Sequence, residues 1–259
     1  MQIFRCELTL LENTFFSSRE VGNFYQTEPV IGNYALCYAL GLAVSAYHNQ
    51  GEIHYAEHLG ALNRSGIYLT PAQIIGPPRF KLEQFNAMPD SYWYAMGNNA
   101  LITKPDGWDT DQNGSSWYLV ERSTGTRKKI GTSNRPQIGR IKMLGIGNRA
   151  CFYLLSANPV PRLPSYIRLG KWNSKASLKV EPVSFTSIEG AQKKVEPLLN
   201  PVDLLAVTQL HTFDLISIHP APLVRNVVAT GSFYQLGDQA KTLLPTNMRF
   251  GVEEIHRGR

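Results

Sequence analysis

Short β-like runs, separated by glycine, proline and asparagine, dominate the sequence beyond Pro71 and limit the folds that it can adopt. Apolar and polar residues also alternate over residues 2–11, which predicts a strand at the start of the chain. Many successive strands without regular βαβ alternation predict an α+β fold built on an antiparallel sheet. The runs that predict strands are Arg79–Asn86, Tyr92–Met96, Ala100–Lys104, Trp117–Arg122, Gln137–Gly145, Ala150–Ser156, Tyr166–Leu169, Ala176–Ser184, Thr212–His219 and Leu223–Thr230.

Helical patterns are confined to a few places. Thr27-Glu28-Pro29 combines a cap residue, an acidic first turn and an early proline, and the spacing after it predicts a helix to about Tyr47. A weaker pattern predicts a second helix over Glu52–Leu62. In the second half we expect a helix only at Ser187–Leu199, followed by a short helical start at Asn200-Pro201.

A β-hairpin is expected within a polar part of the chain. The runs Trp117–Arg122 and Arg127–Ile130 flank Ser123-Thr124-Gly125, which has the composition of a tight turn. A chain of 259 residues, 43% hydrophobic and 18% charged, can bury a core without disulfides or a metal. We therefore expect one domain over residues 1–259.

The sequence favours a soluble cytoplasmic protein that does not bind a membrane. It has no run of about 18 apolar residues, and its first residues do not resemble a signal peptide. Cys6, Cys37 and Cys151 lie far apart in apolar runs, which predicts reduced thiols in the core. His54-Tyr55-Ala56-Glu57-His58 fits a zinc pattern, but no third ligand is evident. We expect no metal and no cofactor.

No motif in the chain supports an enzyme directly. Gly145-Ile146-Gly147-Asn148-Arg149-Ala150 fits a dinucleotide fingerprint, but a β-run follows it, so we expect a tight turn between strands. Neither a nucleophile elbow nor a P-loop is present. We predict no catalytic residue. The alternative is metal-free RNA cleavage by groups such as Tyr47-His48.

Basic residues are concentrated in the middle of the chain. Thirteen lysines and arginines lie between Arg122 and Val180 without a single acid, whereas the other residues hold 13 basic and 20 acidic side chains. Aromatic residues interleave with them. Cations bind phosphates and aromatic rings stack on unpaired bases, so this pattern predicts one contiguous cationic groove for single-stranded RNA. The alternative is a basic surface that faces only solvent.

We predict thirteen RNA-binding residues, twelve of them from residues 117–175 and one from the loop that follows the first strand. They are Arg19, Trp117, Arg122, Arg127, Lys128, Lys129, Arg135, Arg140, Lys142, Arg168, Lys171, Trp172 and Lys175.

Two segments resemble a known family. LTLLENTFFSSREVGNFYQTEPVIGNYALCYALG (Leu8–Gly41) and, more loosely, IRLGKWNSKASLKV (Ile167–Val180) resemble the capping subunit of the type I-D CRISPR effector complex (Cascade). That subunit belongs to the Cas-five group of RAMP proteins, of the Csc-one type. The resemblance implies a ferredoxin-like, RRM-related core with a thumb-like β-hairpin insertion, which we place at about residues 104–142.

The resemblance also implies a function in antiviral defence. A similar protein is a non-catalytic subunit that caps the 5′ handle of the guide RNA and helps to engage the protospacer-adjacent motif of target DNA. Its protein partners are the backbone RAMP subunit and the large subunit of the complex. Two alternatives remain open, an endoribonuclease that processes precursor guide RNA and a scaffold that contacts only protein.

Overall fold

The protein consists of two compact units, described here from a computed structural model. The structure describes residues 1–22, 24–44, 54–86, 92–95, 100–103, 105–113, 116–130, 138–160, 162–204, 208–237 and 242–252. The first unit comprises Met1–Glu20, Tyr25–Lys81 and Lys142–Arg259, and the second comprises Val21–Phe24 and Leu82–Ile141. Residues 104–141 of the insertion predicted at about 104–142 belong to the second unit.

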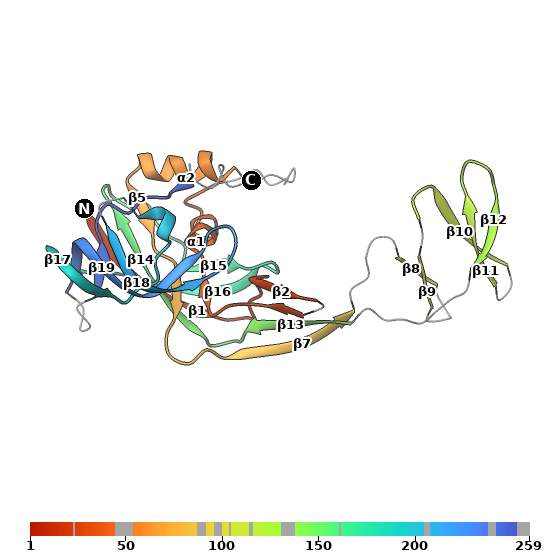
Figure 1. Ribbon diagram of the computed structural model, residues 1–259, viewed down its shortest axis with the longest axis horizontal. Coiled ribbons are helices and arrows are strands. Elements are labelled where there is room, and N and C mark those ends of the chain that lie inside the picture. The colour runs from red at the N-terminus through yellow and green to blue at the C-terminus, as the bar shows by residue number, and fades with distance from the viewer. Residues whose placement is uncertain are drawn as a thin grey trace. The chain divides into compact units, whose positions relative to one another are not determined.

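The main sheet of the first unit has seven strands, which pair in an antiparallel manner (Figure 1). As predicted, the first strand runs from Gln2, and its alternate residues Cys6, Leu8 and Leu10 are fully buried. The order is β15 (Tyr166–Leu169), β16 (Ser174–Pro182), β1 (Gln2–Leu10), β14 (Arg149–Ser156), β6 (Ala72–Ile74) and β4 (Val30–Ile31), with β5 (Ile67–Leu69) also paired to β14.

The first helix is shorter than the sequence predicts. Val30–Ile31 pairs with β6 as strand β4, and α1 covers only Asn33–Ala39. The prediction was wrong because Thr27 does not cap a helix: its hydroxyl donates to the Phe16 carbonyl and accepts from the Phe16 amide. At the other end, Gly41 has φ of +70°, and its amide donates to the Tyr38 carbonyl, which terminates the helix. The predicted end near Tyr47 lies outside the described residues.

The helix predicted at Ser187–Leu199 is also wrong. This segment forms strand β17 (Phe185–Val195), which pairs along its length with β19 (Leu223–Leu236). Local spacing suggested a helix, but pairing with a strand some forty residues away satisfies the backbone instead. The same sheet contains β18 (Gln209–Ile216) and β20 (Leu243–Pro245), both paired with β19.

The remaining helices agree better with the sequence. Helix α2 covers Tyr55–Arg64, close to the predicted Glu52–Leu62. The short start after Asn200 is a 3₁₀ turn over Pro201–Asp203, in which the Asn200 side chain accepts a hydrogen bond from the Val202 amide. Within the described residues no helix has the length and apolar character needed to cross a membrane.

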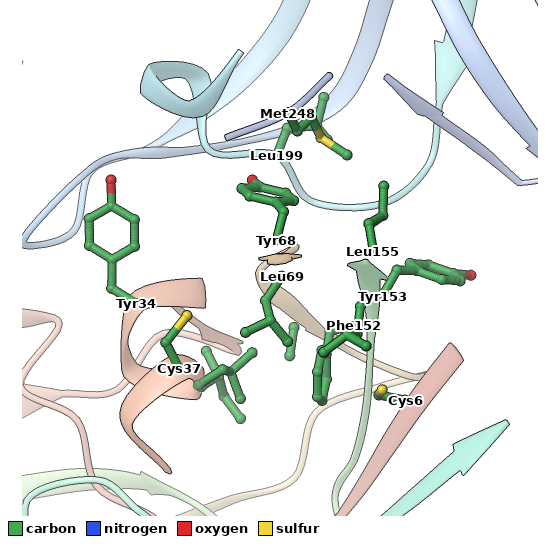
Figure 2. Packing of buried hydrophobic residues seen from close by; sticks show 14 of the residues in the cluster. Cys6, Tyr34, Cys37, Tyr68, Leu69, Phe152, Tyr153, Leu155, Leu199 and Met248 are labelled. Carbon is green, nitrogen blue, oxygen red and sulfur yellow. The ribbon is translucent and has the colours of Figure 1, made fainter. Parts of the chain in front are cut away.

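The core of the first unit joins both sheets and both helices. In Figure 2, Tyr34 and Cys37 come from α1, Tyr68 and Leu69 from β5, and Phe152 and Leu155 from β14. Phe152 and Leu69 are fully buried, as is the Cys6 thiol of β1. None of the three cysteines forms a disulfide; Cys6 and Cys37 are buried and Cys151 is partly buried.

The second unit contains the hairpin that the sequence predicts. Strands β11 (Ser116–Glu121) and β12 (Arg127–Ile130) are antiparallel and are joined by a turn in which Gly125 has φ of +68°. Strand β10 (Trp108–Asn113) pairs on the other side of β11. The sequence did not predict β10, because its composition of aspartate, asparagine and glutamine is that of a loop.

The described residues also form a two-stranded and a four-stranded sheet. Strands β8 (Tyr92–Ala95) and β9 (Ala100–Thr103) form a hairpin. A four-stranded sheet contains the strands through which the chain passes between the units, in the order β2 (Arg19–Val21), β3 (Phe24–Gln26), β13 (Ile138–Leu144) and β7 (Phe80–Asn86). The structure therefore confirms an α+β fold of antiparallel sheets with few helices.

The glycine-rich motif at residues 145–148 is a tight turn between β13 and β14, as predicted. Gly147 has φ of +79°, and the buried Asn148 side chain donates to the carbonyls of Gly145 and Arg79. A strand follows this turn, so the motif does not form a dinucleotide site.

Candidate nucleic-acid interface

A rigid turn carries the best-defined group of predicted residues. Strands β15 and β16 pair with Arg168 opposite Lys175, and residues 170–173 connect them. Gly170 has φ of +73°, and a Cβ atom there would lie 2.4 Å from the Phe15 carbonyl oxygen. The Lys171 amide donates to that same oxygen at 2.9 Å, and the Ser174 hydroxyl donates to the Asn13 carbonyl at 2.7 Å. These contacts fix the turn against the loop that follows β1.

The turn holds aromatic rings next to cations. The Trp172 ring packs against Phe15 with centroids 5.2 Å apart, yet 53% of Trp172 remains exposed. Beside it the Lys175 ammonium lies 4.5 Å from the centroid of the Tyr166 ring, which is also exposed. Such rings can stack on bases while the neighbouring cations bind phosphates.

An open groove of about 910 Å³ lies between this hairpin and α1. Its walls include the consecutive residues of β15, the end of α1 from Ala35 to Gly41, and Phe16. Three cations line it, Arg168, Lys171 and Lys175, and no aspartate or glutamate is among its lining residues. We call this cavity the basic groove. Its positive charge favours an anionic ligand.

One carboxylate lies near the basic groove without lining it. Glu12 accepts a hydrogen bond from the Lys175 amide at 2.8 Å and lies 3.8 Å from the Arg168 guanidinium. Arg168 also donates to the Asn173 carbonyl at 3.1 Å. The Glu12–Arg168 pair is a single contact of 3.8 Å between two side chains that are more than half exposed, so it is weak and Arg168 can turn to a phosphate.

A second, smaller cavity of about 260 Å³ adjoins the basic groove. Phe16, Ala35, Tyr38 and Lys171 line both cavities. We call the smaller one the aromatic pocket, because the rings of Phe16, Tyr34, Tyr38 and Tyr55 contribute to its walls. The pocket also includes Asn33, Asn200 and the segment from Ile218 to Ala221.

A buried carboxylate holds two residues that line the aromatic pocket, Asn33 and Tyr34. Asp203 is 1% exposed and accepts hydrogen bonds from the Asn33 amide, the hydroxyls of Tyr34 and Tyr68, and the Gly251 amide, at 2.6–3.1 Å. Burial raises the pKa of Asp203 to about 6, although its hydrogen bonds oppose the shift. The network ties α1, β5 and the end of the chain together.

The Tyr38 side chain connects the groove to α2. Its hydroxyl lies 3.0 Å from Nδ1 of His58. Burial raises the pKa of Tyr38 to about 12, so the hydroxyl stays protonated at neutral pH. His54 and His58 belong to the candidate zinc motif, but the described residues contain no cluster of three metal-ligating side chains.

Besides Trp172, two predicted residues of the first unit are not among the lining residues of the basic groove. Arg19 pairs with Glu28 at 2.9 Å. The Lys142 ammonium lies 3.9 Å from the centroid of the Phe80 ring. Neither contact prevents these side chains from reaching a ligand, but neither places them with Arg168, Lys171 and Lys175.

The predicted cations of the second unit are partly neutralised. Arg122 makes two hydrogen bonds of 3.0 Å to Asp109, and Arg127 pairs with Asp111 while lying over the Tyr118 ring. Both acids come from the unpredicted strand β10.

Other predicted residues of this unit are exposed or lie outside the description. Lys128 and Lys129 are exposed on β12, and Arg140 is exposed on β13. Trp117 lies on β11, but its side chain is outside the description, as is all of Arg135. Of the thirteen predicted residues, the structure brings together Arg168, Lys171, Trp172 and Lys175 on one hairpin of the first unit.

Four residues of the site were not among those predicted from the sequence. Phe15, Phe16 and Tyr166 contribute rings beside the cations, and Tyr38 lines both cavities. The signal for the first two was an adjacent pair of phenylalanines in an otherwise polar loop. Tyr38 carried no signal, because a tyrosine in an apolar helix reads as a core residue.

The fold and the groove define an α+β protein with a cationic, aromatic surface suited to single-stranded nucleic acid. Comparison of sequences then identifies the family. Residues 1–253 match the family described as Type I-D CRISPR-associated protein Cas5/Csc1, and the chain belongs to it. This confirms the resemblance seen in Leu8–Gly41 and Ile167–Val180.

Other comparisons add little. None of the curated proteins matches the chain. Among solved structures, the chain is similar to one in the cryo-EM structure of the Type III-B Cmr-beta bound to cognate target RNA and AMPPnP, with 14% identity over 87% of this chain and 86% of that chain and a TM-score of 0.41. A likeness of that size supports no statement about function.

Proposed function

We propose that the protein is a non-catalytic RNA-binding subunit of a type I-D CRISPR effector complex, and that it caps the 5′ handle of the guide RNA. The basic groove carries this proposal. It combines three cations, the exposed Tyr166 ring and no acidic lining residue, and the turn that carries Lys171 is held against the Phe15 carbonyl by hydrogen bonding within the protein. Family membership supplies the biological context.

The groove has the chemistry to hold a strand by its backbone. Arg168, Lys171 and Lys175 bind successive phosphates, and the exposed Tyr166 ring in the groove offers a surface to a base, as does Trp172 on the adjoining turn. Phosphate contacts fix the position of the strand without reading its sequence. This suits a subunit that must hold the constant end of every guide, while base pairing by the guide reads the target.

The remaining assignments extend the proposal. The main sheet with α1 and α2 corresponds to a ferredoxin-like RAMP core, and residues of about 104–142 correspond to the thumb-like insertion. Lys128 and Lys129 then add contacts to the guide RNA. The other partners are the backbone RAMP subunit, the large subunit, and target DNA near the protospacer-adjacent motif, in the cytoplasm.

Tyr38 and His58 are the side chains at the groove on which an endoribonuclease could depend. The two side chains are in hydrogen-bond contact, and Tyr38 lines the cationic groove. A metal-free ribonuclease could use such a pair as general acid and general base. The raised pKa of Tyr38 keeps its hydroxyl protonated, which makes it a poor general base. The alternative based on His48 concerns a residue outside the description.

Salt dependence tests the proposal. For Lys171→Ala with Lys175→Ala, we expect weaker binding to handle RNA and a slope of log K against log salt that is smaller by about 1.4, or ~0.7 per lost phosphate contact. Lys179→Ala with Lys194→Ala removes the same charge from exposed residues that do not line the groove, and should leave the slope nearly unchanged. Equal slopes in both variants would refute the groove as the RNA site.

Incubation with repeat RNA in EDTA tests the non-catalytic part. We expect the RNA to be bound and to remain intact. Discrete fragments that Tyr38→Phe or His58→Ala abolishes would instead establish an endoribonuclease.

A further inference from the structure

We propose that the aromatic pocket receives one unpaired nucleobase of the strand that lies in the basic groove. This inference rests on the proposed function and adds to it, because a groove that binds only phosphates needs no such pocket. The two cavities meet at Lys171, Phe16, Ala35 and Tyr38, which line both. A strand held at Lys171 by a phosphate therefore has its next base beside the pocket entrance.

The size of the pocket suits a single base. Its volume of about 260 Å³ lies below the roughly 300–1,000 Å³ of cavities that hold drug-sized ligands. The adjoining groove is more than three times larger, at about 910 Å³, which leaves room for several nucleotides outside the pocket.

The walls of the pocket are aromatic rings whose hydroxyl groups are already engaged. Tyr34 donates its hydroxyl to Asp203, and the hydroxyl of Tyr38 is in contact with His58. The Tyr34 and Tyr55 rings are 5.6 Å apart between centroids, and those of Tyr38 and Tyr55 are 6.2 Å apart. Tyr34 is 2% exposed and supports the Tyr55 ring, so the half-buried rings of Tyr38 and Tyr55 give the preformed apolar surface on which a base can stack.

Polar groups surround these rings and can meet the edge of a base. Ser17, Ser18 and His219 line the pocket; the Ser17 hydroxyl donates to Glu20 and can still accept, and the Ser18 hydroxyl accepts from the Glu28 amide and can still donate. Asn200 is 1% exposed, and its amide donates to the Asn33 oxygen only at 3.4 Å. No aspartate or glutamate lines the pocket, and the Asp203 carboxylate behind it is screened by the four hydrogen bonds that it accepts.

Abasic substitution tests the inference on the unaltered protein. A short single-stranded RNA is prepared as a series in which each nucleotide in turn lacks its base, and its dissociation constant is measured. We expect one position at which the loss weakens binding roughly 5- to 150-fold, the effect of one stacked base. A flat series, with salt-dependent binding intact, would refute the pocket and leave the proposed function standing. No RNA binding at all would refute both.

A pocket-filling variant then locates the base. Ile218 is half-buried and lines only the aromatic pocket, so Ile218→Trp should fill it and abolish the effect of the sensitive abasic position. Leu215→Trp is the matched control, because Leu215 is 60% exposed and lines neither cavity. A sensitive position that survives in Ile218→Trp would place the base elsewhere.

If Ile218→Trp does not fold, a fluorescent base in the RNA tests whether the base stacks in the pocket of the wild-type protein. With 2-aminopurine at the sensitive position, we expect its emission to be quenched on binding to the wild-type protein, because it stacks on tyrosine rings. Unquenched emission would overturn the inference.

Discussion

At the scale of single residues, Asp203 shows how burial changes the chemistry of a carboxylate. Its pKa of about 6 exceeds the ordinary value of 3.8, so the folded protein binds this proton more tightly than the unfolded chain does. The contribution of Asp203 to stability is therefore greatest below pH 4 and is lost as pH rises through 6. This sign is the reverse of that for a carboxylate stabilised by a salt bridge.

The variant Asp203→Asn should remove that pH dependence. We expect the difference in unfolding free energy between wild type and variant to change by on the order of 2 kcal/mol between pH 4 and pH 7. Urea unfolding at several pH values measures it. Asp214→Asn alters an exposed carboxylate on β18 and serves as the control. Parallel curves for wild type and Asp203→Asn would show that the pKa of Asp203 is not raised.

Single residues also show where sequence patterns fail. The cations of the site were predictable, because Arg168, Lys171 and Lys175 belong to a stretch without acids. The partners of Arg122 and Arg127 were not, because Asp109 and Asp111 reach them only through the pairing of β10 with β11. A charge count along the chain cannot reveal neutralisation that depends on strand register.

At the scale of elements, the sequence predicted most of the longer strands and helix α2, but it missed short strands such as β5 and β6, made α1 too long and read β17 as a helix. The alternation in β1 reflects one buried face, a local property that the sequence carries. Strand β17 is exposed at most positions, so its sequence has no such alternation, and its partner β19 decides its structure. Helix α1 begins later than the sequence predicts, because Val30–Ile31 pairs with β6 instead of forming the first helical turn. This pairing is again a contact between residues that are distant in sequence.

The β15–β16 turn is the element on which the site depends, and Gly170 tests it. Gly170→Ala combines a left-handed φ with a Cβ atom in collision with the Phe15 carbonyl. Gly76→Ala shares the left-handed φ but has nothing within 4 Å, so it isolates the conformational cost of about 1 kcal/mol. We expect Gly170→Ala to destabilise the protein by at least about 2 kcal/mol more in urea unfolding.

The effect of Gly170→Ala should extend to the ligand. Because Lys171 and Trp172 are held by the same turn, we expect RNA binding to weaken in Gly170→Ala and to be unaffected in Gly76→Ala. Equal effects of the two substitutions on both stability and binding would indicate that the close approach to Phe15 does not matter.

At the scale of the whole molecule, the exposed cations divide between the two units. The first unit carries the basic groove, and the second carries Lys128 and Lys129 on β12. If both units bind the same RNA strand, substitutions in one unit should remove phosphate contacts without affecting those of the other. Their effects on the salt slope should then add, because each phosphate contact contributes separately to it.

The variant that combines Lys128→Ala and Lys129→Ala with Lys171→Ala and Lys175→Ala tests this arrangement. With a handle RNA long enough to reach both units, we expect each pair to reduce the slope of log K against log salt by about 1.4 and the fourfold variant to reduce it by about 2.8. Arg122→Ala is the control in the second unit, because Arg122 is already paired with Asp109 and should contribute little. If the Lys128 and Lys129 pair leaves the slope unchanged, only the first unit contacts the handle, and the acid-free stretch of sequence serves RNA binding in its second half alone.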